Sequence, residues 1–252
     1  MGRVSSAATD KSLTDRIVWI DCEMTGLSLE HDALIEVAAL VTDFELNQLG
    51  EGVDVIIRPE QAALDQMNDF VREMHTTSGL LVELDSGLTM AEAQTRVLDY
   101  VREWVPEPGK APLGGNTVAT DRGFLARDMV ELESYLHYRM VDVSTIKELA
   151  RRWYPRAYFN SPKKVGGHRA LADITESIAE LRYYREAVFV PPPGPTTDQA
   201  RGIAAKYEGG GTPKAGAAGS ARAERGRKHA GSTVVWSALL DAGDRGRGAW
   251  WV

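Results

Sequence analysis

The sequence feature that most constrains the fold is an apolar run that ends in two acidic side chains. Residues 17–23 read Ile-Val-Trp-Ile-Asp-Cys-Glu, as in a buried β-strand that closes with Asp21 and Glu23. Side chains two residues apart on a strand share a face, so both carboxylates aim at one point. Like charges partly removed from water need a compensating cation. The run therefore predicts a buried strand with a divalent metal site at its end.

Two more acidic residues stand in apolar settings further along the chain. Asp121 follows a short stretch with two glycines, and Asp173 lies in the segment His168–Asp173. Carboxylate ligands suit hard cations such as Mg²⁺ or Mn²⁺, and two such ions about 4 Å apart serve hydrolysis at phosphorus. We therefore expect Asp21, Glu23, Asp121 and Asp173 to form one oxygen-rich metal site.

His168 is the remaining candidate for chemistry. It precedes Asp173 by five positions, and on a regular helix that offset separates two side chains by about 140°. On one helix, His168 and Asp173 would therefore not share a face. Gly166 and Gly167 allow His168 to lie in a loop while Asp173 lies on a helix, so that both side chains can reach one site. A loop histidine suits a general base, since imidazole titrates near neutral pH. Taken singly, these residues also fit simpler roles: an exposed histidine, a surface charge, or helix caps at Asp121 and Asp142.

Composition and charge narrow the class of protein. The 252 residues are 43% hydrophobic and 26% charged, which is typical of a soluble globular protein. The net charge of -7 disfavours non-specific wrapping of long nucleic acid. Cys22, the single cysteine, excludes an intramolecular disulfide and fits a reducing compartment; by strand parity we expect it in the core, not as a nucleophile. No apolar run reaches the length of a membrane helix, so we expect a cytoplasmic protein.

The pattern of apolar residues predicts a mixed α/β sheet flanked by helices. Three strands come first, as an antiparallel meander, and helices then alternate with short strands. The expected strands are 17–23, 33–42, 53–58, 111–114 and 140–142, and the expected helices are 90–104, a stretch from 121, 143–153 and 171–181. We expect a flexible arm at 1–14, one catalytic domain at 15–190, and a low-complexity, disordered tail at 191–252.

The order Asp-x-Glu, Asp, His-x4-Asp resembles the DEDDh family of 3′-to-5′ exonucleases, which have the ribonuclease H-like fold. The segments 19–27, 121–125 and 137–153 are similar to the oligoribonuclease branch of that family, and the resemblance runs from about residue 16 to 186. It implies metal-dependent hydrolysis of short oligoribonucleotides, especially dinucleotides, to 5′-mononucleotides by a homodimer with two Mg²⁺ or Mn²⁺ ions. The metal ligands would be Asp21, Glu23, Asp121 and Asp173, and the general base would be His168.

The resemblance also implies a set of substrate-binding residues. Leu27 would wedge against a base and Phe70 would stack on one, although the family usually has tryptophan at the second position. The 5′ phosphate would be held by Thr117, where serine is usual, and by Arg139 and Ser144. The other two implied residues are Tyr138, supplied across the homodimer interface, and the substrate-site histidine His75.

Other interpretations of the sequence remain open. Phe70 and Leu27 are also typical of core residues, and Tyr138–Arg139 could be an ordinary helix end. A broader exonuclease that trims longer RNA or DNA ends has the same metal ligands, and a non-catalytic module that binds small dinucleotides has the same binding residues. Cleavage rates on two-nucleotide and twenty-nucleotide substrates separate the two enzymes. An Asp21→Ala variant separates either enzyme from a binding module.

Overall fold

The apolar run with the two acids occupies the middle of a mixed sheet. The structure is a computed structural model that describes residues 15–163 and 167–208. Within them, β1 (Arg16–Met24) pairs antiparallel with β2 (Leu34–Asp43), and β2 pairs antiparallel with β3 (Gln48–Ile56). On its other side β1 pairs parallel with β4 (Pro112–Gly115), and β4 pairs parallel with β5 (His137–Asp142). The sheet order β3-β2-β1-β4-β5 confirms the expected meander with parallel strands added.

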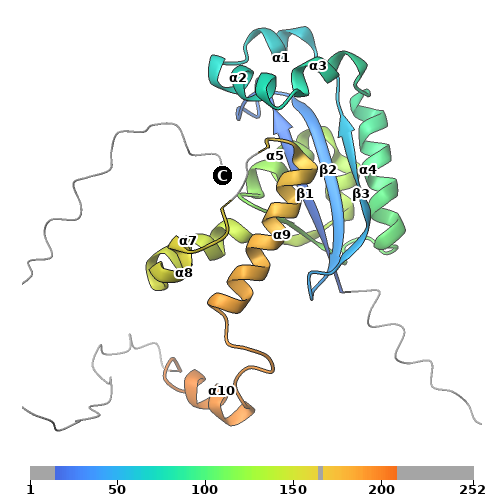
Figure 1. Ribbon diagram of the computed structural model, residues 1–252. Helices are drawn as coiled ribbons and strands as arrows, with labels where there is room; N and C mark the ends of the chain where they lie inside the picture. The colour runs from blue at the N-terminus through green and yellow to red at the C-terminus, as the bar shows by residue number, and fades with distance from the viewer. Residues whose placement is uncertain (1–14, 164–166, 209–252) are drawn as a thin grey trace, which may run out of the picture. The chain divides into compact units, whose positions relative to one another are not determined.

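Helices cover both faces of this sheet (Figure 1). One core contains the even-numbered side chains Val18, Ile20 and Cys22 of β1, together with residues of the helices α4 (Met90–Trp104), α5 (Ala119–Asp128) and α6 (Val130–Tyr135). The opposite core contains Ile17 and Trp19, together with residues of α7 (Val143–Trp153) and α9 (Ala170–Ala187). The short helix α8 (Pro155–Phe159) follows α7. Cys22 is buried in the first core, which confirms that it packs there and points away from the two acids.

The helix with the clearest sequence signal is α4. Thr89 Oγ1 accepts a hydrogen bond from the Glu92 backbone at 3.3 Å, and Glu92 Oε2 accepts one from the Thr89 backbone at 2.9 Å. This reciprocal capping box fixes the start of the helix. The helix then buries Ala93, Val97 and Val101, as their spacing predicts, and also Leu98.

Several boundaries differ from those expected. β3 begins at Gln48 rather than Val53, because Gln48 and Leu49 already pair with β2 ahead of a register shift. Gly50 and Gly52 adopt positive φ angles of 72° and 88° in this segment. β5 begins at His137, so the alternative of a helix end at Tyr138–Arg139 is wrong.

A group of short helices between β3 and α4 has no counterpart in the sequence prediction. It comprises α1 (Gln61–Asp65), α2 (Asp69–Thr77), α3 (Leu80–Glu83) and the 3₁₀ helix η1 (Leu84–Ser86). Each is too short to show a sustained period of 3.6 residues. The group lies beyond the end of the sheet to which β1 points (Figure 1).

The chain divides into two units between Phe189 and Val190. In the second unit α10 (Thr197–Ala204) is a helix, where the expectation was disorder. Thr196 and Gln199 form a capping box at its start, a signal that the neighbouring prolines masked. The arm 1–14 and residues 209–252 of the tail lie outside the described residues. Among the helices that are described, none has the length and apolar character to cross a bilayer.

Candidate active site

Asp21 and Glu23 extend one face of β1 beyond its apolar core. Their odd-numbered positions place them on the face that carries Ile17 and Trp19, which pack in the core with α9. Glu23 is only 8% exposed and lies directly opposite Glu36 of β2. Glu23 and Glu36 are thus two buried carboxylates that lie side by side on neighbouring strands, near the end of β1.

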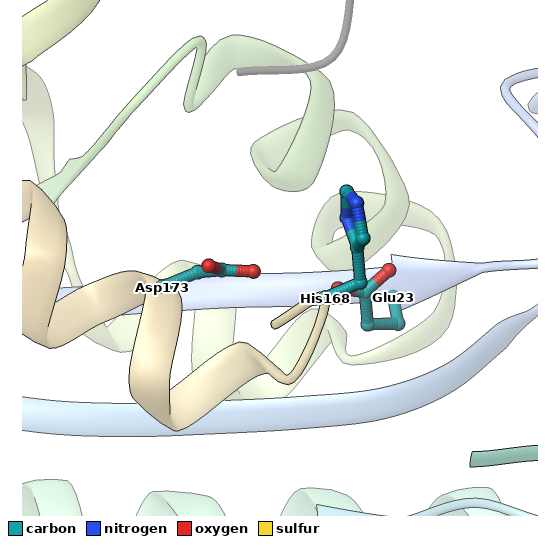
Figure 2. Close-up of side chains that lie close together, drawn as sticks. All are labelled: Glu23, His168 and Asp173. Carbon is teal, nitrogen blue, oxygen red and sulfur yellow. The ribbon is translucent and has the colours of Figure 1, made fainter. Parts of the chain in front are cut away.

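His168 and Asp173 join Glu23 at this end of the sheet. One ligand atom from each of the three side chains lies within 4.8 Å of the others. Figure 2 shows the three side chains close together. Asp173 is in the first turn of α9, which begins at Ala170. His168 precedes the helix and has a φ angle of 48°. The expected division, with His168 in a loop and Asp173 on a helix, is confirmed.

Asp121 reaches the site from the opposite layer of helices. It lies in the first turn of α5, whose N-cap is Val118, so Asp121 does not cap this helix. Instead its Oδ1 accepts a hydrogen bond from the Cys22 backbone N–H at 3.0 Å, beside the two acids of β1. Asp142 differs: it is the N-cap of α7 and accepts from the Ser144 backbone at 2.9 Å. The cap alternative is therefore confirmed for Asp142 and wrong for Asp121.

Burial is the main cause of raised pKa values for two acids of the site, Glu23 and Asp121. Burial, followed by the charges of Glu36, Asp173 and Asp121, raises the pKa of Glu23 from 4.5 to about 8. Burial also raises the pKa of Asp121 to about 7, against the hydrogen bonds from the backbone that lower it. A site in which the carboxylates resist ionisation has an excess of negative charge. The clustered oxygen ligands and this excess fit the binding of divalent cations.

Arg169 and Glu36 belong to the same region and were not anticipated. Arg169 Nε donates to Glu36 Oε1 at 2.9 Å, and the charge of Arg169 is the cation that lowers the pKa of Glu23. The available signal was the single acid in the apolar run 33–42, which repeats the pattern of Glu23.

Leu27 and Phe70 lie on the surface. Their exposed fractions are 46% and 50%, so the core alternative is wrong for both. His75, by contrast, is fully buried on α2. Its Nε2 lies 2.9 Å from the Met24 carbonyl oxygen, and its Nδ1 lies 4.0 Å from Glu23 Oε2. The structure thus places His75 behind Glu23 and away from the surface.

The expected phosphate-binding hydroxyls adjoin each other. Thr117 Oγ1 and Ser144 Oγ are 3.1 Å apart, and Ser144 Oγ also donates to Asn116 Oδ1 at 3.0 Å. Asp142 Oδ1 joins the two segments, because it accepts from the backbones of both Thr117 and Ser144. These contacts hold Thr117 in a left-handed conformation with a φ angle of 53°.

Tyr138 and Arg139 lie on the edge strand β5. Tyr138 is 73% exposed, and the Arg139 guanidinium carbon lies 5.6 Å from the centre of its ring. Arg122, next to Asp121, donates to the carbonyl oxygens of His137 and Tyr138. This arginine was not singled out from the sequence, where nothing marks it as different from the other arginines.

Comparison with solved structures relates the fold to exonucleases. The chain matches exonuclease I of Methylocaldum szegediense with a TM-score of 0.51 at 23% identity, and E. coli exonuclease I in its zinc-bound form with a TM-score of 0.55 at 16% identity. Each match covers 69% of this chain but only 41% of the solved one. At these identities the likeness concerns the ribonuclease H-like fold alone.

Sequence comparisons are more specific. A family model described as Exonuclease matches residues 18–181. The oligoribonuclease of Streptomyces coelicolor is 75% identical over 195 residues, which cover 77% of this chain and 98% of that protein. The oligoribonuclease of Cutibacterium acnes is 72% identical over 193 residues, covering 77% and 96%. On these sequence matches, the chain belongs to the oligoribonuclease family of exonucleases.

Proposed function

We propose that this protein is a metal-dependent 3′-to-5′ exoribonuclease that degrades short oligoribonucleotides, especially dinucleotides, to 5′-mononucleotides. The observation that carries the proposal is the approach of Glu23, His168 and Asp173 to within 4.8 Å of one another. The names of the relatives support the substrate class. An exonuclease that trims long ends is the competing function, and substrate length separates the two.

The residues at the end of β1 have distinct proposed roles. Asp21, Glu23, Asp121 and Asp173 would hold two divalent ions, Mg²⁺ or Mn²⁺. When bound, such ions supply charge neutralisation and activation of water. His168 would accept the proton of the attacking water, because its imidazole lies beside two of the carboxylates.

A second set of residues would bind the substrate. Leu27 and Phe70 are exposed as base contacts require, and stacking on an aromatic ring tolerates any base. Thr117, Arg139 and Ser144 would bind the 5′ phosphate. A site that binds a terminal 5′ phosphate in this way favours the shortest substrates, because a longer RNA has a further nucleotide at the position of that phosphate. The fully buried His75 is assigned no substrate contact in this proposal.

Arg139→Ala is expected to remove the preference for short substrates. A hydrogen bond to a charged group contributes about 1.5–3 kcal/mol, so we expect the rate on a 5′-phosphorylated diribonucleotide to fall by about 10- to 100-fold. The rate on a twenty-nucleotide RNA, which does not place a terminal phosphate there, should change little. The measurement is the length profile of cleavage with Mn²⁺, with EDTA as the metal control. Arg151→Ala, an exposed arginine on α7, is the matched variant and should keep the wild-type profile.

Two outcomes would contradict this account. A folded, dimeric wild-type protein that leaves the diribonucleotide intact in the presence of Mg²⁺ or Mn²⁺ would refute the proposed enzyme. Equal wild-type rates on two and twenty nucleotides would favour the exonuclease that trims longer ends.

We further propose a homodimer in which Tyr138 acts in the site of its partner. The supporting observation is a surface of exposed apolar side chains on β5, α7 and α8. It consists of Tyr138, Met140, Leu149, Trp153 and Phe159. An unpaired edge strand beside exposed aromatic rings is typical of a protein interface.

Mixed dimers test this arrangement. Tyr138→Ala and His168→Ala should each cleave diribonucleotide poorly, whereas a mixture of the two after subunit exchange should regain activity. In a mixed dimer, the subunit with Tyr138→Ala keeps its own His168 and receives Tyr138 from the other. If the mixture gains nothing although mass measurements show mixed dimers, Tyr138 does not act across the interface.

The cytoplasmic location and the boundaries of the catalytic domain at 15–190 remain predictions.

A further inference from the structure

Arg169 connects three elements around the site. It follows His168 directly and immediately precedes α9. Its Nε donates to Glu36 Oε1 on β2 at 2.9 Å. Its Nη1 and Nη2 donate to Glu83 Oε1 and Oε2 at the end of α3, at 2.9 and 3.3 Å. This two-point contact with Glu83 is a bidentate arrangement, which fixes direction as well as distance.

The same contacts fix the start of α9. Arg169 is the N-cap residue of α9, but its side chain does not cap the helix. Instead, Glu36 Oε2 accepts a hydrogen bond from the backbone N–H of Ala170 at 3.3 Å. Glu36 is fully buried, so its position is set by the sheet. Asp173 lies one turn further on. The acid of β2 therefore holds the first turn of the helix that carries this proposed ligand.

The residue on the other side of Arg169 is His168. It has a φ of 48°, a conformation that most residues avoid. The preceding residue, Gly167, is exposed. Because Arg169 follows His168 directly, the bonds of Arg169 to Glu36 and Glu83 constrain the backbone from which the His168 imidazole projects.

We propose that Arg169 is a positioning residue for His168: by binding Glu36 and Glu83 together, it sets the place of the imidazole relative to Glu23. The inference rests on the proposed function, in which His168 accepts the proton. Arg169 also links α3, in the group of helices that carries Phe70, to the loop of the general base. The proposed base-stacking residue and the proposed general base therefore belong to elements that Arg169 joins.

The test compares Arg169→Met and Arg169→Lys in the full-length protein. A displacement of about 1 Å at a reacting group costs up to about 10²-fold in rate. We therefore expect Arg169→Met to lower kcat for a 5′-phosphorylated diribonucleotide by about 10- to 100-fold, with KM changed less than about threefold. Arg169→Lys keeps a cation that reaches one acid and should recover part of kcat. The matched control is Arg185→Ala, which removes an exposed ion pair with Glu45 at the far end of the same helix.

The outcomes are separable from those of the proposed function. A wild-type protein without cleavage would refute the function, whereas a wild-type kcat in a folded Arg169→Met would refute only the positioning role. A change in KM with kcat intact would also refute it. If Arg169→Met does not fold, Glu83→Ala replaces it: this removes a half-exposed partner, leaves the bond to Glu36, and should still lower kcat with KM unchanged.

Discussion

Glu23→Gln is expected to stabilise the metal-free protein at pH 8 and at the same time abolish cleavage. The pKa of Glu23 is raised to about 8 by burial and then by the charges of Glu36, Asp173 and Asp121. A raised carboxyl pKa means that the folded state binds more protons than the unfolded state. Stability is therefore lost as the pH rises from about 4.5 to about 8, by an amount on the order of a few kcal/mol. Glutamine removes that loss, and it also removes a proposed metal ligand.

The measurement is thermal unfolding between pH 5 and 8, with EDTA and with Mn²⁺. Without metal, the wild type should lose stability across this range more steeply than Glu23→Gln. With Mn²⁺ the wild type should gain more than the variant, because bound metal compensates the ionised carboxylate. Glu73→Gln, an exposed acid on α2, should behave as the wild type. A Glu23→Gln protein that is less stable than the wild type at pH 8 without metal would show that the acids do not repel as described.

His168→Ala is expected to lower kcat by about 10²- to 10⁴-fold, the usual contribution of a general base. The imidazole is close enough to Glu23 and Asp173 to be a metal ligand itself, so activity alone does not assign its role. Mn²⁺ affinity decides: a general base leaves it within about threefold of the wild type, whereas a lost ligand weakens it by tenfold or more. Added imidazole should restore part of the rate if the missing group is a base.

The matched control for this prediction is His31→Ala. His31 is a surface histidine whose side chain is 61% exposed and which lies near Glu30. Its replacement should change neither kcat nor Mn²⁺ affinity. Full activity of folded His168→Ala would exclude the general base.

The sequence was sufficient for features that depend on local pattern. Alternation on β1 placed Asp21 and Glu23 on one face, and the five-residue offset with two glycines placed His168 in a loop. Glu36 stands out as the single acid of the apolar run 33–42, but its pairing with Arg169 was out of reach, because the two residues are 133 positions apart. The sequence also did not decide whether Leu27 and Phe70 are exposed. Both are large apolar residue types typical of a core, and only the arrangement of the neighbouring elements leaves them exposed.

Asp121 and Asp173 approach β1 from opposite sides of the sheet. Their helices, α5 and α9, belong to separate cores, and both cores contain side chains of β1 and β2. The distance between these two carboxylates therefore depends on how closely each helix packs against its face of the sheet. A repacked side chain in either core, however remote from the substrate, moves one of these two proposed ligands and leaves the other in place. In this architecture, we expect metal affinity to depend on the packing of both cores, one on each face of the sheet.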